Sequence, residues 1–497
     1  MKKQALLRII ISTLMFLFIA AAFSGVCMIA ARAADIEFFP AFAAGTAAAV
    51  FWIILALLRG RIFCSYACPL GYIQDITGFL GRKIRRKKSH IQPPRRFLRY
   101  GSGILLLVLF ASGLGAAAGF FEPFSVTGRV LNGFCKPLFQ WLGNVTGLWD
   151  YSEITPVGTG VAAVSAVVMA LIAIAAFFEE RLFCNTLCPA GFLLGLFSRI
   201  SRFRPKFSDR CNHCKACEKV CKTGCIDVEK GIIDNERCVV CGNCSDACKF
   251  SGMVSAGTFL PDEELPGKLD TKRRLFLGGL AAAGAAAALG KDAFNFRSPA
   301  DAAPAAPPGA GTIKDFNLKC TGCQLCIANC PGKVLAPAAL EYGIAGMGQP
   351  LMLPEKGFCD YNCTACNTIC PAGALKPLTL AEKRLWRVGV VVYYKERCVV
   401  VKDGEACGAC AEHCPTGALE MVDYKDGLTI PEVTPEICIG CGGCEYICPV
   451  RPLRAVEVRG LEKQSLIPEH EKMRPKEPEV KKAPQAAAPS ADDAFPF

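Results

Sequence analysis

The strongest constraint on this chain is a run of four cysteines with fixed spacing, Cys-x2-Cys-x2-Cys-x3-Cys, which recurs along the sequence. Two regular copies follow one another within residues 211–248. Three thiolates separated by two residues can wrap a tight loop around one iron–sulfur cube, and the fourth begins a helix that points at the neighbouring cube. We therefore expect a ferredoxin with two [4Fe–4S] clusters and crossed ligand sets. One set is Cys211, Cys214, Cys217 and Cys248, and the other is Cys238, Cys241, Cys244 and Cys221.

A second array of four motifs lies within residues 320–448. Two of its motifs are regular, one widens the first gap by one residue, and one carries a longer insertion between 398 and 407. If each motif again gives its fourth cysteine to the cluster of the adjacent motif, the array forms two more two-cluster modules, hence six clusters in all. The β-rich stretches at 390–394 and 456–458 suit the small α+β halves of such modules. The four sets are Cys320, Cys323, Cys326 and Cys370; Cys359, Cys363, Cys366 and Cys330; Cys398, Cys407, Cys410 and Cys448; and Cys438, Cys441, Cys444 and Cys414.

Other uses of cysteine fit less well. These sets take 24 of the 31 cysteines, and zinc sites do not show this fourfold run in tandem. A small secreted disulfide scaffold is far shorter than 497 residues. The haem-attachment motif Cys-x-x-Cys-His is absent from the sequence, and its four histidines are scattered.

Apolar stretches predict a membrane domain over residues 1–200. Residues 8–31, 41–58, 102–121 and 158–178 are each about long enough to cross a hydrocarbon core of about 30 Å. A cleaved signal peptide is the alternative for the first, but its apolar run is long and three more follow. The fold class expected is therefore a membrane α-helical bundle of four spans joined to α+β ferredoxin modules.

The charges of the loops predict the orientation. Between residues 59 and 99, eleven Lys or Arg residues face one acid, Asp75, whereas loop 122–157 is slightly acidic. Positively charged loops stay in the cytoplasm, so the basic loop and the N-terminus are cytoplasmic and loop 122–157 is outside. Much of the net charge of +12 is therefore explained by the orientation of the chain in the membrane, and we expect no nucleic-acid partner.

A duplicated hairpin is visible inside the membrane domain. Arg61-Ile-Phe-Cys64-x3-Cys68-Pro69-x-Gly71 recurs 120 residues later as Arg181-Leu-Phe-Cys184-x3-Cys188-Pro189-x-Gly191. Two such hairpins are expected to pack about a pseudo-two-fold axis at the cytoplasmic surface, which would bring the four cysteines together. These cysteines are either structural and partner-contacting or the ligands of an additional metal centre. A disulfide is disfavoured on the reducing cytoplasmic side.

The segment 268–312 separates the two arrays. Arg273-Arg274-Leu275-Phe276-Leu277 and the Ala/Gly-rich run after it fit a twin-arginine export signal, and a short fifth span is the alternative. Either interpretation puts residues 313–460 outside the cytoplasm, whereas the two-cluster domain 205–256 stays inside. A cluster-loaded domain must cross folded, which favours the twin-arginine route. Residues 461–497 are rich in Lys, Glu, Pro and Ala and are expected to be a disordered tail.

Two families share these features. Residues 1–260, with four spans, the two C-x3-C-P motifs and two cluster motifs, resemble NapH-type membrane ferredoxins. Residues 268–460, with the twin-arginine stretch and four motifs, resemble NapG/MauM-type proteins. The resemblance implies a fusion of the two in the inner membrane of a bacterium, with the second array in the periplasm. It also implies an electron-transfer subunit of a quinol dehydrogenase that serves an extracytoplasmic cytochrome or reductase.

The mechanism must connect clusters on two sides of a barrier about 30 Å thick, too far for one efficient electron hop. No predicted span contains a histidine for haem b. We favour quinol as the diffusing carrier between the two sides. One alternative is an additional metal centre at the C-x3-C-P motifs, and the other is that the two arrays work separately. An accessory role like that of the NosR- and CcoG-related polyferredoxins, or electron exchange with a cytoplasmic ferredoxin, stays open. A redox-sensing regulator would need an output domain, and none is visible.

No self-contained catalytic site stands out in the sequence. The carboxylates Asp35, Glu37, Glu122, Glu179 and Glu180 lie near the ends of the predicted spans, where solvation at the interface is the simplest interpretation.

Overall fold

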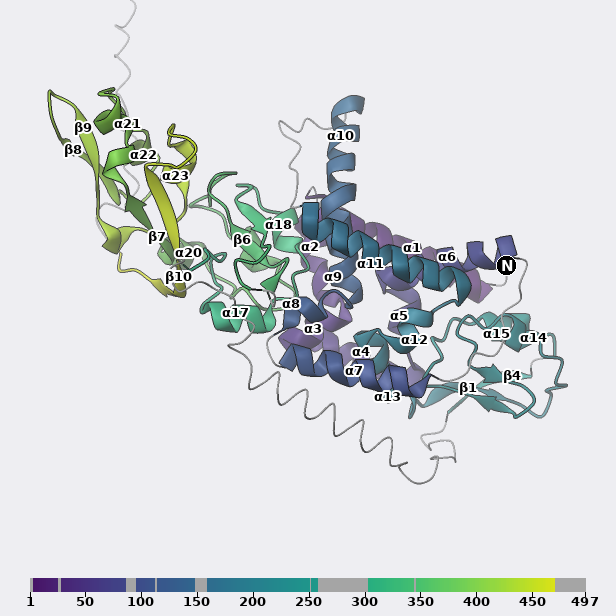
Figure 1. Ribbon diagram of the computed structural model, residues 1–497. Coiled ribbons are helices and arrows are strands. Elements are labelled where there is room, and N and C mark those ends of the chain that lie inside the picture. Colours follow the sequence, from purple (N-terminus) through teal and green to yellow (C-terminus); the bar gives the residue numbers. More distant parts are fainter. Residues whose placement is uncertain are drawn as a thin grey trace, which may run out of the picture.

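The computed structural model describes residues 3–257 and 303–469, apart from 26–27, 86–94, 112–113, 148–158, 251 and 344–345. It has three parts: a helical bundle up to residue 198, a small α+β unit over 203–257, and a larger α+β unit that begins at 303 (Figure 1). The twin-arginine-like stretch and the tail beyond 469 lie outside the described residues.

Two helices of the bundle are long and apolar enough to cross a membrane. They are α1 (Lys3–Ser24) and α11 (Thr159–Phe178), whose most apolar windows have mean hydropathies of 2.4 and 2.7. The other two predicted spans form shorter helices. Helix α4 (Ala47–Arg59) follows α3 (Phe38–Ala44) after a break at Gly45, and α7 is Arg96–Ala111. At 1.5 Å per residue they are about 20 and 24 Å long, less than a bilayer core of about 30 Å.

Each repeat continues in the same way after its apolar helix. A one-turn helix, α5 (Ile62–Tyr66) or α12 (Leu182–Thr186), is followed by a longer one, α6 (Pro69–Arg85) or α13 (Pro189–Ser198). The longer helices begin at the motif's proline, which is favoured at the first helical position because it has no N–H to satisfy. The other helical elements of the bundle are short: α2 (Met28–Arg32), η1 (Ala33–Ile36), α8 (Gly115–Ala118), α9 (Pro123–Val130), η2 (Leu131–Cys135) and α10 (Lys136–Thr146).

The small α+β unit is built from two antiparallel strand pairs. Strand β1 (Phe203–Phe207) pairs with β4 (Met253–Gly257), and β2 (Ile226–Asp227) pairs with β3 (Ile232–Ile233). Its one-turn helices α14 (Ala216–Lys219) and α15 (Asn243–Ala247) each contain the third cysteine of a motif.

The larger unit repeats this plan twice. Its strand pairs are β5 (Leu335–Pro337) with β6 (Pro350–Met352), β8 (Leu419–Asp423) with β9 (Thr429–Val433), and β7 (Trp386–Tyr393) with β10 (Val456–Leu466). The two β-rich stretches expected from the sequence therefore form one strand pair. Its helices are α17 (Ile313–Lys319), α18 (Leu325–Ala328), α19 (Ala365–Thr368), α20 (Leu380–Arg384), η4 (Lys395–Arg397), α21 (Val399–Lys402), α22 (Ala409–Glu412), η5 (Pro435–Ile437) and α23 (Gly443–Ile447).

The larger unit extends beyond both expected boundaries. Ala303 and Thr312 form bridges with Gly460 and Lys463 of β10, so part of the expected linker belongs to the unit. Strand β10 also continues to Leu466, past the expected start of the tail at 461, because Leu466 still pairs with Trp386 of β7.

The two α+β units lie at opposite ends of the bundle (Figure 1). Helix α1 contacts both: the backbone N–H of Ala5 donates to Asp246 of the small unit (3.2 Å), and the Asn329 amide of the larger unit donates to the Ala22 carbonyl (2.9 Å). Along an α-helix these two attachment points are about 26 Å apart. One apolar helix therefore separates the first cysteine array from the second.

Candidate iron–sulfur sites

The small unit brings its cysteines together in the crossed arrangement. Cys248, from the second motif, lines one pocket with Cys211, Cys214 and Cys217 of the first. Conversely, Cys221 of the first motif lies within electrostatic range of Cys241 and Cys244. The two motifs thus exchange their fourth cysteines. This exchange arises because each fourth cysteine follows a one-turn helix that carries the chain from one site to the next.

Cys225 lies closer to these sites than its position outside the motif suggests. Cys225 is buried, and its sulfur is 3.6 Å from that of Cys221. The corresponding positions after Cys370 and Cys414 carry Ala374 and Ala418. Sequence reasoning missed this proximity, although the shared offset from the fourth cysteine is a signal that could have found it.

The larger unit shows the same exchange twice. Cys370 lies within electrostatic range of Cys320, Cys323 and Cys326, and Cys330 lies within range of Cys359 and Cys366. Two further pockets are each lined by one crossed set. They contain Cys398, Cys407, Cys410 and Cys448, and Cys414, Cys438, Cys441 and Cys444.

The four sites of the larger unit form a row. The Cys359 N–H donates to the Cys441 carbonyl (2.9 Å), which links the two modules at their inner sites. The Cys320 site is nearest the bundle, because the fully buried guanidinium of Arg129 donates to the carbonyls of Thr321 (3.0 Å) and Gly322 (2.8 Å). The Cys398 site, beside α21 and β9, lies at the end farthest from the bundle (Figure 1).

These sets suit cubane clusters better than single ions. Within the described residues, no three Cys, His, Asp or Glu side chains converge tightly enough for one metal ion. A cubane takes each thiolate on a different iron and so needs a wider set of soft sulfur ligands. Burial raises the pKa of the Cys326 and Cys444 thiols well above the ordinary value, so the binding of iron by these thiols would release protons.

The two C-x3-C-P motifs meet in the core of the bundle through reciprocal contacts. Arg61 of the first repeat donates to the Cys184 carbonyl of the second (2.8 Å), and Arg181 donates to the Cys64 carbonyl (2.5 Å). All four motif cysteines are buried, with exposed fractions of 3–5%. The expected pseudo-two-fold packing of these hairpins is therefore present in the structure.

The second cysteine of each motif also begins the next helix. The sulfur of Cys68 accepts the N–H of Gly71 (3.4 Å), and that of Cys188 accepts the N–H of Gly191 (3.3 Å). A side-chain acceptor at this position satisfies one of the free N–H groups at a helix start. Gln74 donates to the sulfur of Cys184 (3.3 Å). Because cluster thiolates also accept hydrogen bonds, these contacts leave all four cysteines able to act as ligands.

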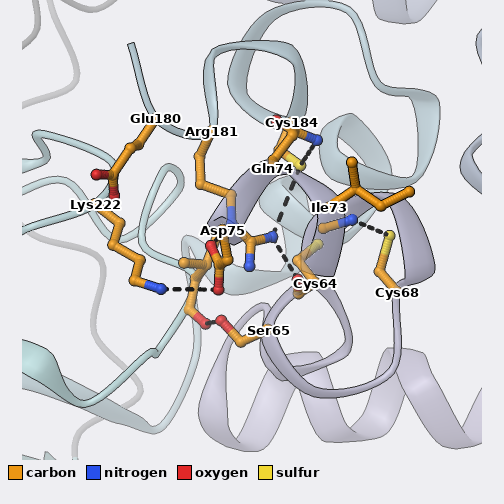
Figure 2. A network of polar contacts seen from close by, with 12 residues as sticks. Cys64, Ser65, Cys68, Ile73, Gln74, Asp75, Glu180, Arg181, Cys184 and Lys222 are labelled. Carbon is orange, nitrogen blue, oxygen red and sulfur yellow. Dashed lines mark hydrogen bonds and ion pairs between the residues drawn. The ribbon is translucent and has the colours of Figure 1, made fainter. Parts of the chain in front are cut away.

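A network of buried charges surrounds this core (Figure 2). The Asp75 carboxylate contacts Arg181 (2.7 Å), Lys222 (2.8 Å) and Arg8 (3.1 Å). Burial alone would raise the pKa of Asp75, but the charges of Arg181, Lys222 and Arg8 outweigh burial and hold it well below its usual range. Lys222 stands where a proline usually follows the fourth cysteine, so the small unit contributes a cation to the membrane domain.

Solvation at the membrane interface is the wrong interpretation for three of the five carboxylates. Glu37, Glu122 and Glu180 are buried, with exposed fractions of 4%, 1% and 7%, whereas Asp35 is exposed. Glu122 caps α9 by accepting the N–H groups of Phe124 and Ser125. Burial, together with the charge of Glu122, raises the pKa of Glu37 well above its ordinary value.

The fold and its cysteine sites define a polyferredoxin, an iron–sulfur electron-transfer protein, with two candidate membrane helices. Family models match the chain in several places: a 4Fe-4S binding domain at residues 42–88 and 161–208, a second 4Fe-4S binding domain at 208–224 and 317–343, and a 4Fe-4S dicluster domain at 405–451. No solved structure matches it significantly.

Curated relatives specify the family. The methylamine utilization ferredoxin-type protein MauM of Methylorubrum extorquens is 33% identical over 192 residues, 36% of this chain and 86% of the relative. MauM of Methylobacillus flagellatus is 35% identical over 152 residues, 29% of this chain, which spans 62% of that relative's length. The ferredoxin-type protein NapH of Escherichia coli (strain K12) is 28% identical over 218 residues, 42% of this chain and 66% of the relative. The chain belongs to the NapH/MauM-type polyferredoxins.

Proposed function

We propose that this protein passes electrons from the membrane quinol pool to an extracytoplasmic cytochrome or reductase, as part of a quinol dehydrogenase in anaerobic-type respiration. The observation that carries the proposal is the attachment of the two cysteine arrays to opposite ends of α1. An electron-transfer protein that served one compartment would not need clusters at both ends of an apolar bundle. The relatives named MauM and NapH are ferredoxin-type proteins, which supports the same class of function.

The proposed topology is a multi-pass protein of the bacterial inner membrane, with four spans. The end of the bundle that carries Arg8, Arg61 and Arg181 also carries the small unit, because Arg61 donates to the Glu236 carbonyl (3.2 Å). Basic residues gather on the cytoplasmic side, so the small unit is assigned to the cytoplasm and the larger unit to the periplasm. For the two shorter helices, a span requires the neighbouring elements α3 and α8 to complete the crossing.

Six [4Fe–4S] clusters, held by the 24 cysteines of the crossed sets, are the proposed cofactors. A quinol that is oxidised to quinone releases two electrons and two protons, and each cluster accepts one electron. The row of sites in the larger unit then leads electrons from the Cys320 site at the bundle to the Cys398 site at the far end. The redox partner is expected to dock near α21 and β9, where that last site lies.

A second candidate is electron exchange with a cytoplasmic ferredoxin. It is favoured by the exposure of Cys214, which leaves the Cys211 site of the small unit accessible to a soluble partner. An accessory role like that of NosR- and CcoG-related proteins is the third candidate. Those proteins carry two soluble clusters, so the row of four further sites argues for electron throughput instead.

Reduction of the clusters in isolated membrane vesicles tests the proposal. A short-chain quinol analogue should bleach the visible absorbance of the clusters, and a quinone-site inhibitor should prevent the bleaching. A vesicle preparation from cells without the protein is the control. If the quinol leaves the clusters oxidised while a reduced cytoplasmic ferredoxin bleaches them, the electron source is the ferredoxin and the main proposal is refuted.

A further inference from the structure

We propose that Cys64, Cys68, Cys184 and Cys188 together hold a seventh iron–sulfur centre, shared between the two repeats, which relays electrons across the bundle. This inference deepens the proposed electron-transfer function and rests on it. Each repeat supplies two thiols, so neither repeat can hold a four-thiolate cluster alone. A family model described as a 4Fe-4S binding domain matches each hairpin separately, at residues 42–88 and 161–208, although each stretch contains two cysteines.

The backbone around the four thiols is shaped for close approach. A Cβ on Gly71 would lie 2.5 Å from both the Arg181 guanidinium and the Cys64 carbonyl. In the other repeat, a Cβ on Gly191 would lie 2.8 Å from the Arg61 guanidinium and 2.3 Å from the Cys184 carbonyl. A glycine at both positions therefore lets the arginine of one repeat reach the cysteine loop of the other. Each guanidinium also lies 3.9 Å from the sulfur of the first cysteine of its own motif, Arg61 from Cys64 and Arg181 from Cys184.

The charges of this core call for an anion. Arg61 makes no contact with a carboxylate among the described residues, and the buried Nε of Arg61 and Nη2 of Arg181 have no hydrogen-bond partner there. A cubane with four thiolates is anionic and becomes more so on reduction, so it would balance these cations. Around this core, the described residues include the buried cations Arg8, Arg61, Arg99, Arg181 and Lys222, and the carboxylates that form ion pairs with them are Asp75 and Glu236. The buried carboxylate of Glu180 pairs with Arg82 and lies within electrostatic range of Lys222 and Arg181.

The position suits a relay. Toward the cytoplasmic side, Ser65 donates to the Val239 carbonyl (2.6 Å), and Cys241 packs against the same hydrophobic core as Cys64 and Cys68. Toward the other end, the Glu37 carboxylate lies within electrostatic range of Cys68 and of Glu122. Glu122 in turn lies within range of Cys323, a ligand of the first site in the larger unit.

The electron balance of the relay is simple. One electron enters from the cluster of Cys238, Cys241, Cys244 and Cys221, and the charge of the centre becomes more negative by one. The same electron leaves for the cluster at Cys320, or travels in the reverse direction, and no covalent bond forms or breaks. Without such a centre, an electron would have to cross the bundle, along which the two contacts of α1 with the cysteine-bearing units lie about 26 Å apart.

The first test is composition. The full-length protein, purified as the cells make it, should contain about 28 irons per chain for seven cubanes, against about 24 for six. The double substitution Cys64→Ser/Cys184→Ser should lose about four irons and one cluster component of the Mössbauer spectrum. Cys135→Ser is the matched control, because Cys135 is exposed and outside every motif, and it should lose none. About 24 irons in the wild-type protein, or an unchanged iron content in the double variant, overturns the inference.

The second test is electron transfer across the bundle. Wild-type protein in quinone-free liposomes that enclose ferricyanide should convert it to ferrocyanide when dithionite is added outside, one electron for each ion. The Cys64→Ser/Cys184→Ser variant should fall to the rate of protein-free liposomes. If wild-type protein also shows that low rate until a quinone is added, the relay is refuted and the quinol proposal survives.

A third measurement avoids a variant that fails to fold. Arg61→Gln keeps all ligands and removes one cation, so it should lower the midpoint potential of one centre and leave the six others unchanged. A titration in which no centre shifts, or in which alkylation and mass analysis find a Cys64–Cys184 disulfide in the isolated protein, contradicts a cluster at this place.

Discussion

Replacing Asp75 by Asn should destabilise the membrane domain by about 3–5 kcal/mol. Asp75 contacts Arg181, Lys222 and Arg8 at 2.7, 2.8 and 3.1 Å. At an effective dielectric constant of about 20, each pair at about 3 Å attracts by about 5 kcal/mol, and desolvation offsets much of that sum. The variant leaves three buried cations without their shared carboxylate, which is the costly part of breaking such a network.

The sign of the pH dependence follows from the lowered pKa of Asp75. A carboxylate whose pKa is lowered by folding contributes stability that is fully present above its unfolded pKa of about 3.9 and is lost as pH falls through the folded pKa. Between pH 5 and 8 the loss in Asp75→Asn should therefore be constant. Unfolding of the purified protein in detergent, followed by circular dichroism, should show a midpoint lowered by about 6–20 °C across that range.

Glu180→Gln is the matched control. Glu180 is also a buried carboxylate of the bundle, but within the described residues it forms an ion pair with Arg82 alone (2.6 Å), which is 26% exposed. Burial outweighs the attraction of Arg82, Lys222 and Arg181 and raises the pKa of Glu180, so the charge of this carboxylate adds no net stability. Glu180→Gln should therefore change the free energy of unfolding by less than about 1 kcal/mol. Equal effects of the two substitutions, or an Asp75→Asn loss that varies between pH 5 and 8, would show that the three-cation network does not stabilise the domain.

Three further outcomes are expected. Cys248→Ser should remove the cluster of the first motif and about four irons per chain, while the Cys135→Ser control keeps them; loss of the second motif's cluster instead would refute the crossed assignment. Arg129→Gln should weaken the attachment of the larger unit to the bundle and speed its release by protease, because the buried guanidinium donates to the backbone of that unit; an unchanged rate of release would show that Arg129 does not hold the unit. Glu37→Gln should raise the free energy of unfolding by about 1–3 kcal/mol at pH 8, because burial disfavours the ionised form of Glu37. The gain should vanish below about pH 4, where the glutamate is protonated in both states, and a gain that does not depend on pH would contradict the raised pKa.

The cysteine arrangement could be predicted from the sequence because it depends on local spacing. A fourth cysteine three residues after the third follows a one-turn helix, wherever the rest of the chain goes. Even the insertion between Cys398 and Cys407 leaves this geometry unchanged, since α21 (Val399–Lys402) absorbs part of the extra length. The meeting of the two C-x3-C-P hairpins was predictable for a similar reason, because duplicated membrane hairpins pack about a common axis.

The buried charges could not be predicted, because their partners are far apart in the sequence. Asp75 meets Arg8, Arg181 and Lys222 through three different parts of the chain. Hydropathy places a carboxylate near the end of a span and says nothing about what covers it, so Glu37 and Glu122 were expected to be solvated. The length of the spans is likewise a tertiary property: Gly45 breaks one predicted span, and its φ of +65° suits a glycine at the end of α3.

The duplication fixes the geometry of the C-x3-C-P core, but the charges around its two arginines differ. The first repeat carries Asp75, which pairs with Arg181, whereas the equivalent position of the second repeat is Gly195. There the Arg99 guanidinium occupies the space that a side chain would need, and it pairs with Glu236 (3.1 Å). Arg61 is left with the Asn185 amide oxygen (2.9 Å) and backbone carbonyls. A bound anionic centre would therefore take more of its compensation from Arg61 than from Arg181, since the Arg181 charge is already shared with a carboxylate.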